Sequence, residues 1–242
     1  GTESIKAWTN TFLAETWEEQ GETVHASPLM ARREPFSEIV PQDAVVLVAG
    51  CDCQDDRIEV EIVAFGVGEE CWGIEYKTIY GAITNPATWT SLDEFLNRSW
   101  KHESGVQLRV ASAMIDTGYQ SKIVYDFCKP REVNRVFAIK GVAGANRPVV
   151  SRPNRSNSAK VALFSLGVDS AKELIYSRLK IEESGAGYCH FPIGQGYDEE
   201  YFEQLTAEKA VTRVRNGVKS RVWQKTRARN EALDVRVYAL AA

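Results

Sequence analysis

The sequence predicts an α/β fold in which helices flank a mixed sheet, and three observations lead to this prediction. Three strand-like runs joined by tight turns occupy residues 44–78. From residue 85 to residue 140, helical patterns alternate with short apolar runs, which favours parallel strands joined by right-handed crossovers. The chain has 242 residues, 44% of them hydrophobic and 26% charged, so it suits one large globular domain with a real core.

The first half of the expected sheet is an antiparallel meander. Residues 44–52 are apolar on both faces, as in a central strand, and residues 54–56 make a turn. Residues 57–65 alternate between aliphatic and charged side chains, which is the pattern of a strand with two different faces. The third strand is expected to carry four side chains on one face: Trp72, Ile74, Tyr76 and Thr78.

Helices and strands alternate in the second half. Asn85 followed by Pro86 predicts a helix start, because Asn caps helices and proline fits their first turn; this helix is expected to extend to Trp100. A strand ending at Asp116 follows, and residues 121–140 add a helix and a further strand. Three strands followed by helix, strand, helix and strand form the element order of a ribonuclease H-like core with a mixed five-stranded sheet.

The region after residue 140 completes the expected fold. Residues 141–158 are rich in Gly, Pro, Asn, Ser and Arg, which predicts a mobile loop. Asp169 is expected to cap a helix that runs to Leu179. A short acidic helix over 198–205 and a last helix from Asn230 to the C-terminus are also predicted.

Two units are predicted along the chain. Residues 44–242 hold the α/β domain, whereas residues 1–43 form an N-terminal helix followed by an irregular linker. The helix is indicated by apolar residues at helical spacing: Ile5, Trp8, Phe12, Leu13 and Trp17.

The net charge of −4 hides two strongly basic segments. Between residues 209 and 229 there is no acid, and the basic residues are Lys209, Arg213, Arg215, Lys219, Arg221, Lys225, Arg227 and Arg229. Between residues 147 and 160, again without an acid, they are Arg147, Arg152, Arg155 and Lys160. Two basic segments on an acidic body indicate a polyanion bound at one face, although solvated loops are the simpler alternative for either segment alone. The first segment also predicts a β-hairpin over 211–223, because Asn216-Gly217 is a strong turn signal.

Three acids occupy positions where a carboxylate is costly. Asp52 ends the apolar run AVVLVAGCD, Asp116 ends the run VASAMID, and Asp234 lies in the last helix. An ionised carboxylate resists burial unless it is paired, protonated or bound to a metal. Each also has a simpler interpretation: a turn residue at Asp52, a turn or cap at Asp116, and an exposed helix position at Asp234.

Together the three acids indicate a cation site. Because the strands that end at Asp52 and Asp116 are expected to be neighbours ~4.8 Å apart, their carboxylates can bridge two cations. Oxygen ligands favour Mg²⁺ or Mn²⁺, and two such ions support phosphodiester cleavage. The third ligand is expected to be Asp234, but Glu231 lies three residues earlier on a similar face and is a rival.

Several other classes of protein are disfavoured. The chain contains no G-x-x-x-x-G-K-[ST] motif for nucleotide phosphates, no nucleophile elbow and no apolar run of the ~20 residues that span a bilayer. The five cysteines lack zinc spacing and are expected to be reduced, as in the cytoplasm. Cys51 and Cys53 are interpreted as small core residues on the face opposite Asp52.

Six segments give the chain a specific resemblance: AGCDCQDDRIEVEIVAFGVGEECWGIEY, AMIDTGYQSKIVYDFC, RVFAIKG, YCHFP, YDEEYFEQLTAEK and RNEALDVRVYALAA. From about Val45 onward the chain resembles the C-terminal nuclease domain of lambda-type phage terminase large subunits. The segment ETWEE within residues 1–43 resembles the tail of the ATPase domain that precedes the nuclease domain in that family.

The resemblance implies a metal-dependent endonuclease of a viral genome-packaging motor, cutting concatemeric double-stranded DNA in the host cytoplasm. It places the family's acidic triad on Asp52, Asp116 and Asp234, with two Mg²⁺ or Mn²⁺ ions. It implies double-stranded DNA, a terminase small subunit and the portal of the prohead as partners, and no membrane. A basic ribbon can enter the major groove, so the expected DNA contacts are Arg213, Arg215, Lys219 and Arg221, with Arg152 and Arg155 in the loop.

Two other functions stay open. A Holliday-junction resolvase or transposase-like nuclease would use similar acids but would prefer branched DNA. A non-catalytic assembly module of the packaging motor would dock through the helix that carries Trp8 and Trp17, and would cut nothing.

Overall fold

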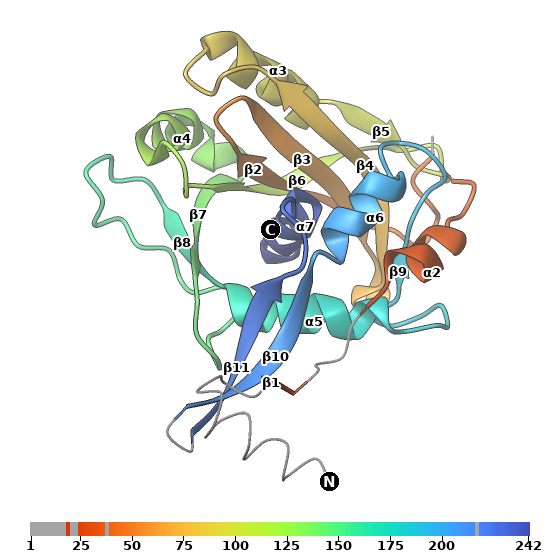
Figure 1. Ribbon diagram of the computed structural model, residues 1–242. Helices are drawn as coiled ribbons and strands as arrows, with labels where there is room; N and C mark the ends of the chain where they lie inside the picture. Colours follow the sequence, from red (N-terminus) through yellow and green to blue (C-terminus); the bar gives the residue numbers. More distant parts are fainter. Residues whose placement is uncertain (1–17, 20–23, 37–38, 216–217) are drawn as a thin grey trace, which may run out of the picture.

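A mixed sheet of eight strands forms the centre of the computed structural model, which describes residues 18–19, 24–36, 39–215 and 218–242 (Figure 1). Seven strands lie in the order β8, β7, β6, β2, β3, β4, β9, and β5 pairs with β6. Their bounds are β2 Val46–Cys53, β3 Arg57–Phe65, β4 Cys71–Tyr80, β5 Ser99–Lys101, β6 Gln107–Asp116, β7 Val136–Val142, β8 Leu163–Gly167 and β9 Cys189–His190. The predicted helix with Trp8 and Trp17 lies outside the described residues.

The strand directions follow the predicted plan. β2, β3 and β4 form the antiparallel meander, whereas β2 is parallel to β6, β6 to β7 and β7 to β8. The mixed α/β sheet is therefore confirmed, but it is larger than the five strands predicted. The three strands that were missed, β5, β8 and β9, have at most five residues each, too few to show a clear period.

The structure differs from the sequence pattern at two points, one in the helix after the meander and one within the meander. The helix that begins at Pro86 ends at Leu96, where the Asn97 side chain donates a 2.8 Å hydrogen bond to the Asp93 carbonyl, so Trp100 lies in β5 and not in the helix. A bulge between Ile62 and Val63 shifts the register of β3 against β4. Beyond this bulge, Tyr76 packs on the face opposite Trp72, because an extra residue reverses the alternation of side chains.

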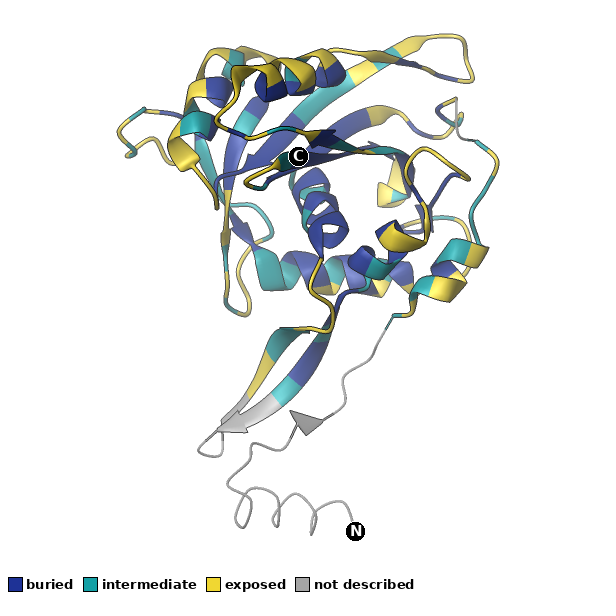
Figure 2. Cartoon of the chain, turned by 45° about the horizontal axis from the view of Figure 1, so that its top comes forward, coloured by how far each residue is buried: buried dark blue, intermediate teal, exposed yellow. Residues whose placement is uncertain are grey.

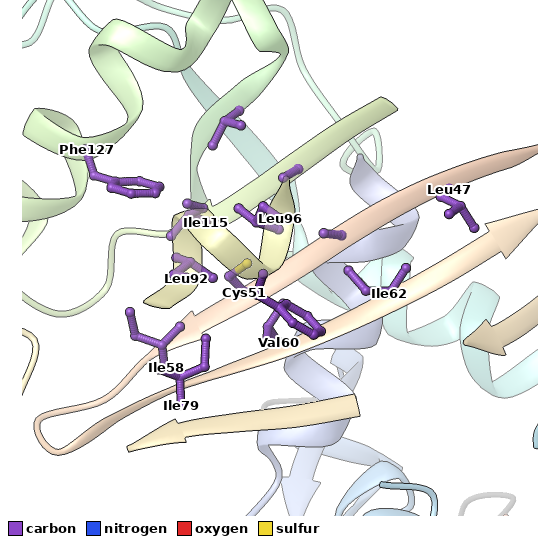
Figure 3. Close-up of a cluster of buried hydrophobic side chains, with 14 of the residues drawn as sticks. Leu47, Cys51, Ile58, Val60, Ile62, Ile79, Leu92, Leu96, Ile115 and Phe127 are labelled. Atoms are coloured by element: carbon purple, nitrogen blue, oxygen red, sulfur yellow. The ribbon is translucent and has the colours of Figure 1, made fainter. Parts of the chain in front are cut away.

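Helices cover both faces of the sheet and enclose two hydrophobic cores. α3 (Pro86–Leu96) and α4 (Ser121–Cys128) cover the first core, which is shown in Figure 3. α2 (Ala26–Ala31), α5 (Val168–Leu179), α6 (Glu199–Leu205) and α7 (Glu231–Ala241) cover the second. Two short 3-10 helices are connections: η1 (Val67–Glu69) lies between β3 and β4, and η2 (Lys129–Asn134) lies between α4 and β7. Cys51 and Cys53 lie in the first core, as predicted.

Helix α7 is buried on nearly all sides between the sheet and α5 (Figures 1 and 2). It approaches β2 at Gly50, where there is no room for a side chain: a Cβ atom would lie 2.0 Å from the Val235 carbonyl oxygen. The glycine therefore permits backbone contact between the helix and the strand that carries Asp52. This contact fixes the distance of α7 from the end of β2.

The predicted hairpin is a separate antiparallel sheet that projects from the body (Figure 1). β10 (Glu208–Arg215) pairs with β11 (Val218–Lys225), and β1 (Glu18–Glu19) pairs with the other edge of β10. Arg215 lies opposite Val218, so two residues connect the strands, and these residues, 216 and 217, lie outside the described part.

The segment between β7 and β8 contacts the sheet at two points. Val150 bridges to Leu166 and Asn154 to Leu163, so this part of the segment runs antiparallel to β8. Its predicted mobility stays a prediction. Asp169 was expected to cap α5, but the helix already begins at Val168, and the Asp169 carboxylate accepts a 2.9 Å hydrogen bond from the Gly144 amide instead.

Residues before β2 also contact the body. Leu29 of α2 is buried in the second core, and the Glu34 amide donates a 2.8 Å hydrogen bond to the Phe191 carbonyl. The predicted division between residues 43 and 44 stays a prediction. Among the described helices, none is long and apolar enough to cross a membrane.

Candidate active site

Two of the predicted acids lie at the carboxyl ends of neighbouring parallel strands: Asp116 is the last residue of β6, and Asp52 is the last but one of β2. In the register of β2 and β6, Cys51 lies opposite Ile115, so Asp52 and Asp116 occupy the next positions at the same edge of the sheet. Only 4% of Asp52 and 9% of Asp116 is exposed. Because Cys51 packs in the first core, the Asp52 side chain points to the opposite face, where α7 lies.

Helix α7 brings the third acid to the same place. Its close contact with β2 at Gly50 involves Val235, the residue after Asp234. One turn further along α7, the Tyr238 hydroxyl lies close enough to the Asp116 carboxylate to act against the rise in its pKa. The sequence reasoning missed Tyr238, although its spacing of four residues from Asp234 places both on one helix face.

Each acid also has a near neighbour that holds its carboxylate. Gln54 Nε2 donates to Asp52 Oδ2 at 2.5 Å, and the Gly118 amide donates to Asp116 Oδ2 at 2.8 Å. Asn230 Nδ2 donates to Asp234 Oδ2 at 3.0 Å. These bonds leave lone pairs on all three carboxylates, because a carboxylate can accept about four hydrogen bonds.

The electrostatics show that the acids act on one another. Burial raises the pKa of Asp52 to about 8, with further increases from the charges of Asp234, Asp116 and Glu231. Burial also raises the pKa of Asp234 to about 6, against the opposing charge of Lys172. The pKa of Asp116 is raised mainly by burial. A cluster of buried carboxylates of this kind favours the binding of a positive charge, either a proton or a metal cation.

The donor set fits a hard divalent cation in chemistry, since all of its ligands are carboxylate oxygens. With the side chains in their present positions, no three His, Cys, Asp or Glu residues of the described part could already hold a metal ion. The binding of a cation by these acids therefore stays a prediction.

Glu231, the rival for the third position, is engaged by arginines. Arg57 donates to Glu231 Oε1 at 2.8 Å, and Arg229 lies 3.3 Å from Glu231 Oε2. The same two arginines contact Glu59, which is fully buried on β3 opposite Asp52. Both oxygens of Glu231 thus already face a guanidinium, whereas those of Asp234 do not.

Comparison with known proteins decides the family. All of residues 1–242 match the family model described as the terminase large subunit gpA, endonuclease domain. The chain belongs to this family. The resemblance inferred from the sequence is thereby confirmed: the chain is an endonuclease domain of the terminase large subunit family.

Two curated relatives are terminase large subunits. The endonuclease domain is 37% identical over 244 residues to that of Escherichia phage lambda and 32% identical over 246 residues to that of Enterobacteria phage P21. Each match covers 98% of this chain and 38% of the relative, so the chain spans a little over a third of these proteins. No solved structure matches it.

The basic residues of the endonuclease domain that are predicted to contact DNA lie in two regions, the hairpin and the loop before β8. Arg213, Arg215 and Lys219 lie on the two strands of the hairpin, but their side chains are outside the described part. Arg221 is about half exposed, and its Nε lies 3.4 Å from Glu173. The contact of these four residues with DNA stays a prediction.

The two loop arginines of the endonuclease domain differ in their surroundings. Arg152 is exposed. Arg155 forms a 2.6 Å ion pair with Glu132 of η2 and donates to the Lys160 carbonyl. The neighbouring Asn154 pairs with Leu163, which lies level with Ala138 of β7 and Ile115 of β6. Its contact with DNA also stays a prediction.

Proposed function

We propose that this chain is a metal-dependent endonuclease that cuts concatemeric double-stranded viral DNA for packaging, by two-metal phosphodiester hydrolysis on a ribonuclease H-like fold. The observation that carries the proposal is the convergence of Asp52, Asp116 and Asp234 from two strand ends and one helix, with each pKa raised. Perturbed acids that gather at one sheet edge are typical of sites that bind cations.

The strand order supports the fold assignment. The core strands lie in the order β4, β3, β2, β6, β7, with the first three antiparallel and the last two parallel to β2. This is the arrangement expected from the element order in the sequence. It places the acids of β2 and β6 side by side at the centre of the sheet.

In the proposed mechanism, Asp52 and Asp116 would hold Mg²⁺ or Mn²⁺ together with Asp234. When bound, two such ions supply an activated water and stabilise the leaving oxygen. Tyr238 interacts with the Asp116 carboxylate and favours its ionised form. Gln54 does the same for Asp52 at 2.5 Å. We propose Asp234 and not Glu231 as the third ligand, because two arginines already neutralise Glu231.

The arginines near the site have a second consequence. Arg57 and Arg229 pair with Glu59 and Glu231, so these two extra carboxylates already have cationic partners. Within the described part of the chain, the three aspartates form no ion pair with an arginine. A cation is thus attracted to them and not to the neighbouring glutamates.

The experiment is cleavage of supercoiled plasmid with and without Mn²⁺. The wild-type chain is expected to cut only with the metal, and Asp52→Asn and Asp116→Asn are expected to lose at least about 100-fold of the rate. Asp126→Asn, which changes an exposed acid paired with Lys122 on α4, is the matched control and should cut normally. Cleavage that persists in EDTA, or in both aspartate variants, would contradict the proposal.

Substrate comparison separates the alternatives. A packaging endonuclease should cut linear duplex at least as well as a four-way junction, whereas a resolvase should prefer the junction. A non-catalytic assembly module should cut neither and should bind no Mn²⁺. For the longer protein, we propose the terminase small subunit and the portal of the prohead as partners, and the host cytoplasm as the place of action.

A further inference from the structure

One side chain, Asn230, connects both ends of the hairpin to a proposed metal ligand. Its Nδ2 donates to Asp234 Oδ2 at 3.0 Å and to Glu208 Oε1, the first residue of β10, at 2.8 Å. Its Oδ1 accepts a 2.6 Å hydrogen bond from Lys225, the last residue of β11. Asn230 is 5% exposed, so these partners replace water.

The chemistry of the partners fixes the orientation of this amide. Its two N–H groups point at two carboxylates, and its oxygen faces an ammonium group. Rotation of the amide by 180° would place the oxygen against the carboxylates and the N–H groups against the ammonium. Asn230 therefore has one favourable arrangement, in which all of its polar atoms are used.

Asn230 also precedes α7 directly, at the position where an asparagine side chain ordinarily caps a helix. Here the side chain makes no capping hydrogen bond to the helix. Its backbone carbonyl accepts the Leu233 and Asp234 amides, while the side chain turns to Glu208, Lys225 and the Asp234 carboxylate. The polar group is thus used between elements and not within α7.

The hairpin end of this connection is firmly held. Lys172 of α5 binds both carboxylate oxygens of Glu208, at 2.7 and 2.8 Å. The Tyr176 hydroxyl donates to the Glu208 carbonyl at 2.6 Å. The Tyr176 ring packs edge-on against Trp223 of β11, with 4.8 Å between the ring centroids. The base of the hairpin and α5 therefore form one packed unit to which Asn230 is attached.

We propose that Asn230 is a positioning residue that sets the Asp234 carboxylate from the base of the hairpin, so that the DNA-holding element and the cleavage site share one geometry. This inference rests on the proposed function, in which Asp234 binds a cation. Hydrogen bonds that hold a metal ligand in place are worth ~10- to 100-fold in metal affinity or activity. Asn230 is expected to contribute in this range.

The test measures Mn²⁺ in two ways: by calorimetric titration of the chain without DNA, and as the concentration that gives half-maximal plasmid cleavage. Asn230→Ala should raise both values about 10-fold or more, with duplex affinity in EDTA unchanged. Lys225→Met removes the contact of Asn230 with β11, leaves its contact with Glu208 of β10, and should shift both values in the same direction by a smaller factor. Lys225→Arg should restore them.

The controls keep the inference separate from folding and from the proposed function. Lys122→Met removes the same charge from an exposed position on α4 and should change neither value. If Asn230→Ala unfolds, the exposed Lys225 variants still decide the question. Unchanged Mn²⁺ values in Asn230→Ala, or equal behaviour of Lys225→Met and Lys122→Met, would overturn the positioning role alone. A wild-type chain that neither binds Mn²⁺ nor cuts would overturn the proposed function, and this role with it.

Discussion

The Arg236 guanidinium donates a 2.6 Å hydrogen bond to the Glu61 carboxylate inside the core, where Glu61 has no exposed surface. The hydroxyls of Tyr197 and Tyr201 donate to the same carboxylate oxygen, at 2.9 and 2.7 Å. This cluster joins α7 to β3 and α6. Since α7 also carries Asp234, the buried ion pair helps to determine where the third acid lies.

Loss of one partner in this pair should be costly. Arg236→Met leaves Glu61 as an unpaired buried carboxylate, so the free energy of unfolding should fall by about 3 to 5 kcal/mol. Urea denaturation measures this change. Arg98→Met, which breaks the partly exposed ion pair with Glu75, is the control and should cost about 1 kcal/mol or less. Equal losses in the two variants would show that burial of the pair has no special effect.

The contact between Gly50 and α7 should tolerate no side chain. In Gly50→Ala the new Cβ would meet backbone atoms of Val235 and Ala239, and the backbone cannot move as a side chain can. We expect a loss of about 3 kcal/mol or more in the free energy of unfolding. Gly141→Ala is the matched strand variant, because its Cβ would meet only a side-chain methyl of Val168. It should be clearly milder in the same denaturation measurement.

The raised pKa of Asp52 predicts how stability depends on pH. Because the pKa is about 8 in the folded chain and near 4 when unfolded, the folded state holds the proton more tightly between these values. Without metal, this group's contribution is present below pH 4 and is lost as pH rises to 8, a change of about 5 kcal/mol for a shift of about four pKa units. Asp52→Asn should flatten this dependence in thermal or urea unfolding.

Divalent cations should offset the loss of stability that occurs as pH rises. Addition of Mn²⁺ at pH 8 should stabilise the wild-type chain, because the cation binds the ionised carboxylates of the folded state. The same addition should have little effect on Asp52→Asn. Stabilisation of both chains by the same amount would indicate that Mn²⁺ binds elsewhere.

Substitutions of Asp234 and of Glu231 are expected to affect different properties, metal-dependent cleavage for Asp234 and stability for Glu231. Asp234→Asn should reduce Mn²⁺-dependent plasmid cleavage by at least about 100-fold and weaken Mn²⁺ binding, because it removes a proposed ligand. Glu231→Gln should lower cleavage by less than about 10-fold, but should reduce stability, since Arg57 and Arg229 lose an ionic partner. The reverse ranking of the two variants would assign the third position to Glu231.

The hairpin should carry the salt-dependent part of duplex binding. Replacement of its four predicted contacts, Arg213, Arg215, Lys219 and Arg221, by Ala should lower the slope of log affinity against log salt by up to about 4. Fluorescence anisotropy in EDTA measures this slope, and Mn²⁺ binding should stay intact. Lys122→Ala serves for comparison, because it removes an exposed charge on α4 that is paired with Asp126, and it should change the slope little. An unchanged slope in the fourfold variant would exclude the hairpin as the DNA contact.

Much of the fold follows from local signals. The caps at Asn85 and Asp198 accept hydrogen bonds from the helices that they precede, as their residue types suggest. Alternating and continuous apolar runs were sufficient for β2, β3, β6 and β7, because buried strands must place apolar side chains on at least one face. Short elements such as β9 gain their structure from their neighbours and leave no such pattern.

Some features of the candidate site are likewise visible in the sequence, whereas others depend on the tertiary structure. The sequence alone determined that Asp52 and Asp116 end buried strands, because an acid that closes an apolar run is visible without coordinates. Only the tertiary structure showed that Glu231 is paired with two arginines, that Tyr238 contacts Asp116 and that Asn230 joins the hairpin to Asp234. These relationships depend on side chains far apart in the chain, and their geometry arises only when α7 packs against β2 at Gly50.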